Sequence, residues 1–155
     1  MIFLKTDEEV ELMRASNILL GKTYVESVTD SKILDFIENN IWIIPLSPRV
    51  SDYDVLEGTN ITLEGAKALA AATERCWKAL TACDIEEWGK ASKESFYAQI
   101  AMYPNMAPRE VLDSIELYKD KVKGFKITGA GGGGYLVLIN DTPVENALKI
   151  RIRRS

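Results

Sequence analysis

The chain has 155 residues, of which 46% are hydrophobic and 27% charged, with a formal net charge of −4 and no histidine. This length is typical of one globular domain with its own core, and the negative charge argues against general binding to nucleic acid or anionic membranes. The lack of histidine excludes Ser-His-Asp and Cys-His nucleophilic centres and every zinc site that uses histidine.

The sequence also carries signals about location. No apolar run approaches the roughly 20 residues that a membrane-spanning helix needs. The first residues, Met-Ile-Phe-Leu-Lys-Thr-Asp-Glu-Glu, lack the layout of a signal peptide because acidic residues follow at once. We therefore expect a cytoplasmic protein. Cys76 and Cys83 lie two helical turns apart, too far for a disulfide, so we expect buried free thiols.

The first predicted element is an N-terminal helix. Thr6 and Glu9 form a capping box, and apolar residues at helical spacing continue to about Glu26. Residues 1–14 resemble the start of a type I methionine aminopeptidase. The dinuclear metal site of that enzyme needs Asp, Glu and His further along, and no matching continuation follows, so its chemistry does not carry over. We assign residues 1–29 to a helical extension that is natural, fused or coincidental.

Next come a short helix, a strand and a loop. Asp30 or Ser31 caps the helix, which carries Leu34 and Ile37. Residues 41–44 form a β-branched and aromatic strand, and Pro45 ends it because proline cannot donate to a sheet ladder. Residues 46–60 have few periodic apolar positions, which predicts a surface loop.

Three helices are expected in the middle of the chain. The first begins at Thr62, and a capping box of Asp84 and Glu87 opens the second, which runs through Ile100. Pro104 ends that helix, and Pro108 fits the first turn of the third, which stops near Gly124.

The C-terminal part predicts strands around a glycine-rich loop. Segments 124–128 and 135–139 are apolar and β-prone, residues 141–143 form a turn, and residues 144–148 are a candidate short helix. Alternation over residues 149–153 predicts a final half-buried strand, whose basic side chains form its solvated face. The fold class is therefore α+β, with several helices packed on one small, mostly antiparallel sheet.

The glycine-rich loop is the most informative feature. Five of the ten glycines lie within residues 129–134. Gly129, Gly131 and Gly134 fit the dinucleotide fingerprint G-x-G-x-x-G, but a strand and not a helix follows, so that interpretation fails. Two interpretations stay open: a concave nest of amides that binds an anion, and a hairpin whose glycines let it pass tightly over a neighbouring helix.

The string from Lys126 to Gly134 resembles the third signature motif of the GHMP small-molecule kinases, whose loop borders the active site beside the phosphates. Upstream residues resemble the sugar-kinase branch of that superfamily, namely Pro48-Arg49, Tyr53-Asp54-Val55-Leu56, Thr59-Asn60-Ile61-Thr62 and the helical stretch from Gly65 to Pro104. The resemblance covers roughly Asp30 to the end, so residues 30–155 are expected to form a GHMP kinase C-terminal-like domain.

The resemblance implies ATP-dependent phosphorylation of a sugar or sugar phosphate, with ATP and Mg²⁺ as cofactors of the complete family enzyme. The family's main ATP-binding motif and its catalytic aspartate belong to an N-terminal domain, and no such string occurs here. We therefore expect this chain to be inactive alone, to bind neither cofactor tightly, to hold no metal, and to need a kinase N-terminal domain or self-association. The alternative is a non-catalytic module that binds a metabolite or a partner chain.

Candidate site residues follow from the motif and from side-chain chemistry. The phosphate-side loop comprises Lys126, Thr128, Gly129, Ala130, Gly131, Gly132, Gly133 and Gly134. A candidate substrate wall comprises Arg49, Ser92 and Ser95. By strand alternation Lys126 and Thr128 share a side, which suggests a solvent or ligand face. Arg49 is either an anion clamp or a solvated surface charge, and the two serines face either a substrate or a neighbouring helix. The identity of the substrate stays open.

Overall fold

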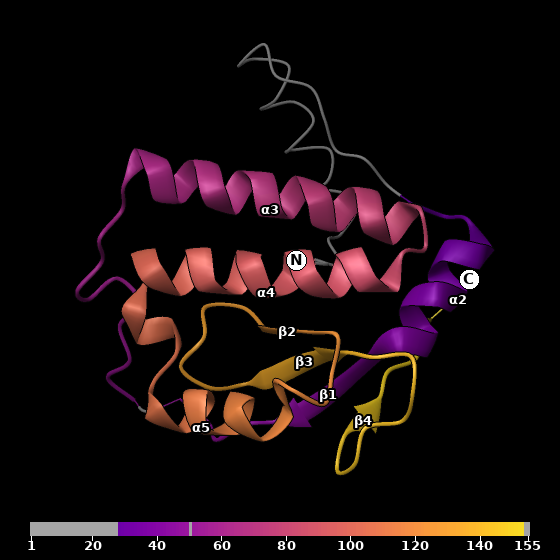
Figure 1. Cartoon of the computed structure of the whole chain (residues 1–155). Helices are drawn as coiled ribbons and strands as arrows, with labels where there is room; N and C mark the ends of the chain where they lie inside the picture. Colours follow the sequence, from indigo (N-terminus) through magenta and orange to yellow (C-terminus); the bar gives the residue numbers. More distant parts are fainter. Residues whose placement is uncertain (1–27, 50, 154–155) are drawn as a thin grey trace.

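The computed structural model describes residues 28–49 and 51–153. The predicted helix over residues 6–26 and the resemblance of residues 1–14 lie outside the described residues. The elements, with the labels of Figure 1, are α2 (Ser31–Asn40), β1 (Ile41–Pro45), α3 (Leu63–Thr81), α4 (Ile85–Met102), the 3₁₀-helix η1 (Pro104–Met106), α5 (Arg109–Tyr118), β2 (Gly124–Ile127), β3 (Tyr135–Ile139) and β4 (Leu148–Lys149).

Side-chain caps fix the starts of three helices at the predicted positions. The carboxylate of Asp30 accepts from the Lys32 amide at 2.7 Å, and the Thr62 hydroxyl accepts from the Gly65 amide at 3.0 Å. Asp84 accepts from the Glu87 amide at 3.1 Å. Each cap satisfies an amide that the first helical turn leaves without a partner. Pro108 lies one position before its predicted place, because it is the N-cap of α5 and not a residue of its first turn.

The four strands form one antiparallel sheet in the order β2-β3-β1-β4. In the register, Ile43 lies opposite Val137, and Val137 lies opposite Lys126. The α+β class with an antiparallel sheet is confirmed. Pro45 closes β1 opposite Tyr135, and β4 pairs with β1 only at Trp42 and Ile43, so no ladder bond from Pro45 is required on that side.

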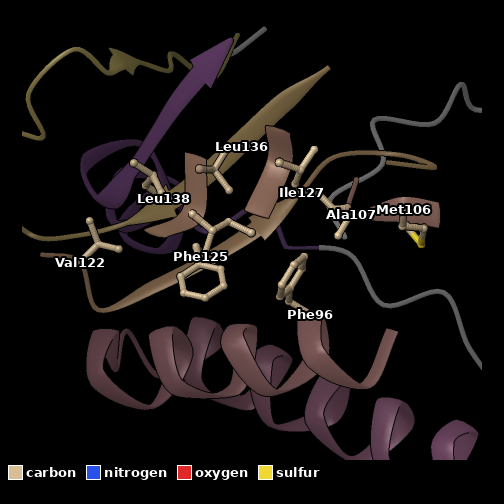
Figure 2. Close-up of a cluster of buried hydrophobic side chains, with 10 residues drawn as sticks. Phe96, Met106, Ala107, Val122, Phe125, Ile127, Leu136 and Leu138 are labelled. Atoms are coloured by element: carbon tan, nitrogen blue, oxygen red, sulfur yellow. The ribbon is translucent and has the colours of Figure 1, made fainter. Parts of the chain in front are cut away.

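Helices cover both faces of the sheet (Figure 1). α3 packs against α4, α4 packs against β2, and α5 lies across the opposite face near β3. The main core lies between α4, α5 and the sheet, where Phe96 and Phe125 meet edge to face with ring centroids 5.5 Å apart (Figure 2). A second cluster joins α2 and the end of α3 to β1, with Ile37, Leu80 and Trp88 among its members.

One backbone contact sets how closely α4 approaches the sheet. A Cβ built on Gly124 of β2 would lie 2.4 Å from the Cα atom of Gly89 in α4, and a Cβ on Gly89 would lie 2.6 Å from the carbonyl of Lys123. No side chain fits between two backbones at this distance. The pair therefore brings Lys126, two residues further along β2, against the middle of α4.

The C-terminal segment differs from its prediction. Residues 144–148 form no helix: the Ala147 amide bonds the Val144 carbonyl in a turn, and Leu148 instead pairs with β1. A five-residue helix gains too few hydrogen bonds to offset its nucleation cost. The final strand is also shorter than predicted, because the Ile152 amide donates to the Glu38 carboxylate of α2 at 3.1 Å and not to a strand.

Among the described residues, no helix is both long and apolar enough to cross a membrane. The two cysteines are free, as expected, but they are only partly buried.

The Gly89–Gly124 contact predicts a large effect of one added methyl group. Gly124→Ala should lower the free energy of unfolding by about 3 kcal/mol, because neither backbone can yield without separating α4 from β2. Urea denaturation of the full chain measures this. Gly65→Ala is the control: its methyl group would meet side-chain atoms of Met102 and Thr62 rather than a neighbouring backbone, and it gains about 1 kcal/mol of helix propensity. Equal stability of the two variants would contradict the contact.

Candidate functional site

The glycine-rich loop adopts a backbone that only glycine adopts readily. Gly129, Gly131, Gly132 and Gly134 have φ between 59° and 87°, and Gly133 has φ 152°. A Cβ is strained at these angles whatever space surrounds it. The loop is anchored at its ends, where the Thr128 amide bonds the Tyr135 carbonyl at 3.0 Å and the Leu46 amide bonds the Gly134 carbonyl at 2.8 Å.

Three central glycines are also required by packing. A Cβ on Gly131 would lie 2.3 Å from the carbonyl oxygen of Met106, and one on Gly132 would lie 2.3 Å from the Tyr53 ring. A Cβ on Gly133 would lie 2.4 Å from the Ser47 carbonyl. The loop thus passes tightly against η1 and the segment after β1, as the hairpin interpretation expected.

Two side chains from the segment after β1 cover carbonyl groups of the loop. Arg49 Nε donates to the Gly131 carbonyl at 2.7 Å, and the Tyr53 hydroxyl donates to the Ala130 carbonyl at 2.7 Å. The Arg49 guanidinium lies 5.7 Å from the centre of the Tyr53 ring, within the range of a cation–π contact. Burial raises the pKa of Tyr53, against a smaller opposing effect of Arg49, so the hydroxyl stays protonated and donates at neutral pH.

Only some of the backbone amides of the loop have a hydrogen-bond acceptor. The Gly132 amide donates to the Met106 carbonyl at 2.9 Å and the Gly131 amide to the Thr128 carbonyl at 3.3 Å. Within the part of the chain that the structure describes, the amides of Gly129, Ala130, Gly133 and Gly134 have no acceptor. The carbonyls of Gly129, Gly132 and Gly133 likewise have no donor among the described residues, so the loop presents both free donors and free acceptors. Free amides of this kind are the groups that an anion-binding nest uses.

Lys126 contacts one of the two candidate serines, Ser95, and the other, Ser92, lies one turn away on α4. Lys126 Nζ donates to Ser95 Oγ at 2.8 Å and to Gln99 Oε1 at 3.1 Å, both on α4. Ser95 is 3% exposed, and Ser92 is 4% exposed with its Oγ 3.5 Å from Cys76 Sγ. Burial lowers the pKa of Lys126 below its ordinary value. These groups join β2, α4 and α3 and do not form an open face.

Thr128 lies two residues beyond Lys126, at the point where the hairpin opens into the loop. Its hydroxyl accepts from the Tyr135 amide at 3.2 Å and lies 3.2 Å from the Tyr135 carbonyl, so it closes the base of the hairpin. Arg49, a candidate for the substrate wall, lies in contact with the candidate phosphate-side loop. The contacts of Tyr53 and Met106 with the loop were not predicted. For Tyr53 the sequence offered only the resemblance of Tyr53-Asp54-Val55-Leu56 to the sugar-kinase branch.

One hollow of the molecule borders the glycine-rich loop, and another lies along α4. A cavity of about 40 Å³ lies between the loop and α5, lined by Ser47, Glu110, Ser114, Gly132 and others, and has room for only a very small group. An open depression of about 440 Å³ is lined by charged side chains of α4 and by Lys123.

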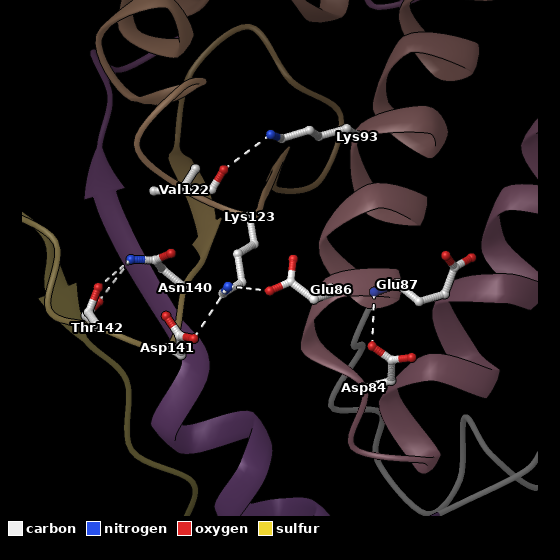
Figure 3. Close-up of polar contacts among 9 residues, drawn as sticks. All are labelled: Asp84, Glu86, Glu87, Lys93, Val122, Lys123, Asn140, Asp141 and Thr142. Carbon is white, nitrogen blue, oxygen red and sulfur yellow. Dashed lines mark hydrogen bonds and ion pairs between the residues drawn. The ribbon is translucent and has the colours of Figure 1, made fainter.

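Lys123 and Lys93, two of the cations that line the larger depression, are bonded to neighbouring groups (Figure 3). Lys123 lies between Glu86 and Asp141, with 3.4 Å separating its Nζ from the Asp141 carboxylate. Lys93 Nζ donates to the Val122 carbonyl at 3.1 Å. These contacts hold α4 to the turns on either side of the β2–β3 pair. The charged side chains of this depression therefore have a structural role.

The residues present suit a phosphate group better than a metal ion. Mg²⁺ prefers carboxylate oxygens in octahedral arrangement, and in residues 28–49 and 51–153 no group of three or more His, Cys, Asp or Glu side chains gathers. Free backbone amides and a guanidinium are phosphate-binding groups.

Comparison with known proteins gives limited relationships. No protein-family model matches the sequence. The chain is 28% identical over 98 residues to a bifunctional fucokinase/GDP-fucose pyrophosphorylase from Arabidopsis thaliana; the match covers 63% of this chain and 9% of that protein. A crystal structure of mevalonate kinase is similar at a TM-score of 0.45 and 16% identity, over 89% of this chain and 50% of that chain, which is too low to establish a shared fold.

The burial of Lys126 predicts a dependence of stability on pH. A lysine whose pKa is lowered in the folded state binds fewer protons when folded than when unfolded, so its destabilising effect diminishes as pH rises through its folded-state pKa toward the ordinary value near 10.5. Relative to Lys126→Met, the native chain should therefore gain stability as pH rises in the alkaline range. Urea denaturation of both proteins at several pH values measures this. A constant difference would contradict a charged, buried amine.

The contact of Gly132 with Tyr53 predicts strong coupling between the two positions. Gly132→Ala should lower the free energy of unfolding by about 2–3 kcal/mol, because the methyl group meets the ring and the φ of 68° is strained for alanine. In a Tyr53→Ala background only the backbone strain of about 1 kcal/mol should remain. A double-mutant cycle by chemical denaturation measures the coupling, and additive effects would show that the ring does not restrict the loop.

Proposed function

We propose that this chain is the C-terminal portion of a GHMP-type, ATP-dependent small-molecule kinase whose substrate is a sugar or sugar derivative. Its glycine-rich loop contributes donors on the phosphate side of the active site. The observation that carries this proposal is the loop itself, in which the motif residues from Lys126 to Gly134 present free amides beside an arginine.

The relationship to a fucokinase-containing protein supports a sugar as the substrate class. The chain is 28% identical to that protein over 98 residues and spans only 9% of its length. We therefore do not assign all the activities of the Arabidopsis protein to this chain. The proposal takes from this relationship a kinase-like segment, with phosphorylation of a sugar hydroxyl as the reaction class.

The chemistry of phosphoryl transfer explains what such a segment does. The transition state spreads negative charge over the phosphoryl oxygens, so catalysis depends mostly on positioning and on charge stabilisation. Backbone amides held by a rigid loop stabilise that charge without reorganising. Arg49 and Tyr53 hold the Gly131 and Ala130 carbonyls, and this keeps the loop from rearranging when an anion approaches.

The proposal assigns ATP and Mg²⁺ to the complete enzyme. ATP supplies the phosphoryl group and Mg²⁺ neutralises its charge during transfer. The described residues offer contacts for a phosphate and no cluster of carboxylates for the metal. We therefore expect the chain alone to be inactive, and to act together with an ATP-binding portion.

A chimera tests this function. The segment of the Arabidopsis protein that aligns with this chain would be replaced by the matching residues of this chain, and ATP-dependent phosphorylation of fucose would be measured. We expect activity above background in the chimera and its loss when Gly131→Val is added, because a side chain at that position meets the Met106 carbonyl.

The native chain is assayed beside the chimera with ATP, Mg²⁺ and hexoses. Phosphorylation by the chain alone, or submillimolar binding of ATP·Mg²⁺ by calorimetry, would show that it is not merely a portion of a kinase. A folded but inactive chimera would overturn the functional equivalence of the two segments and would favour a non-catalytic binding module.

A further inference from the structure

The Arg49 side chain crosses the glycine-rich loop from one end to the other. Its Nε donates to the Gly131 carbonyl at 2.7 Å, and its guanidinium lies 5.7 Å from the centre of the Tyr53 ring. A Cβ added at Gly133 would lie 3.3 Å from its Cγ and one added at Gly129 would lie 3.3 Å from its Nη2, so the side chain runs along the loop. The hydrogen bond and the ring contact restrict the rotamers of this side chain. Little further entropy is lost when it binds a ligand.

The outer end of the guanidinium is unpaired. An arginine carries N–H donors on Nε and on both outer nitrogens, and only Nε has an acceptor among the residues that the structure describes. No carboxylate of those residues lies within ion-pair distance of Arg49, unlike Arg75, which pairs with Glu87 and Glu94. The charge of Arg49 is thus both fixed in place and available.

We propose that Arg49 is a ligand-binding residue, and that its outer nitrogens together with the free amide of Gly129 bind a phosphate group. The inference rests on the proposed function, because it takes the loop as the phosphate side of a kinase. It adds to that function a charged contact from outside the glycine motif. A planar guanidinium binds two phosphate oxygens at once, and the third oxygen remains for a backbone amide.

The arrangement favours phosphate over a neutral sugar hydroxyl. The carbonyls of Ala130 and Gly131 would repel an anion, but Tyr53 and Arg49 already bond them. The amides of Gly129 and Ala130 have no acceptor among the described residues and are available to donate to a ligand. Because Arg49 is exposed, the group reaches it from solvent, either as the phosphate of a nucleotide or as that of a phosphorylated sugar.

The test is an NMR titration of the full chain with inorganic phosphate. We expect saturable millimolar shifts of the Gly129 and Ala130 amide signals and of the Arg49 side-chain N–H signals. Arg49→Gln should weaken binding at least tenfold, and Arg49→Lys should weaken it less because the charge remains. Lys90→Gln is the control, since it removes the same charge from an exposed position on the distant charged depression.

If Arg49→Gln distorts the loop, the N–H signals of the Arg49 side chain in the native chain still report whether this residue binds phosphate. Should phosphate shift the amides but leave these signals unchanged in the native chain, Arg49 only fastens the loop and the proposal is wrong. It is also wrong if Arg49→Gln and Lys90→Gln weaken binding equally, or if millimolar phosphate produces no saturable shift.

Two further titrations identify the source of the phosphate. Adenosine monophosphate and a hexose 6-phosphate are compared with inorganic phosphate, and the tighter ligand indicates whether the nucleotide or the sugar carries the group. This experiment is independent of the chimera. Phosphate binding at Arg49 together with an inactive chimera would reject the kinase function alone, whereas an active chimera without binding would reject the role of Arg49 alone.

Discussion

The close approach of backbone to backbone is the constraint on which this structure depends. At Gly131 the loop lies against the Met106 carbonyl, and at Gly124 the sheet lies against Gly89 of α4, in both cases too close for a Cβ. Helices separated from a sheet by side chains usually lie farther away, since a layer of side chains fills the space between them. Here glycines remove that layer at two points along β2 and its loop. The loop is thereby fixed between η1 and the segment after β1, and Arg49 and Tyr53 can reach its carbonyls.

The same contacts determine which backbone donors and acceptors of the loop are already hydrogen-bonded. A free glycine-rich loop exposes carbonyls and amides in equal number and has no preference for an anion. Among the described residues, Tyr53 and Arg49 donate to the Ala130 and Gly131 carbonyls, while the amides of Gly129 and Ala130 have no acceptor. Packing and the proposed binding therefore depend on different residues of the same loop. The glycines from 131 to 133 serve packing, and in the proposed site the Gly129 amide is the donor beside the guanidinium.

The sequence predicted the parts of the fold that depend on local chemistry. Caps at Asp30, Thr62 and Asp84 marked helix starts because a side-chain oxygen satisfies a nearby amide. Residues 144–148 were expected to form a short helix, but pairing of Leu148 with β1 prevailed. Alternation placed Lys126 and Thr128 on one side, yet it could not show that α4 covers Lys126 and binds the amine. The contact of Arg49 with Gly131 joins residues 82 positions apart, and no local pattern encodes it.

The donor character of the loop bears on how a kinase built from this chain must be organised. Phosphoryl transfer needs cationic and N–H groups to hold phosphate oxygens, and it needs carboxylates to hold Mg²⁺ and to accept the substrate proton. In the proposed function, the loop and Arg49 provide the first set. Carboxylates placed equally close would pair with Arg49 and remove the charge that attracts the ligand. In the proposed function the two sets must therefore come from separate segments and meet across the phosphate, so the ligand itself joins the portions of the enzyme.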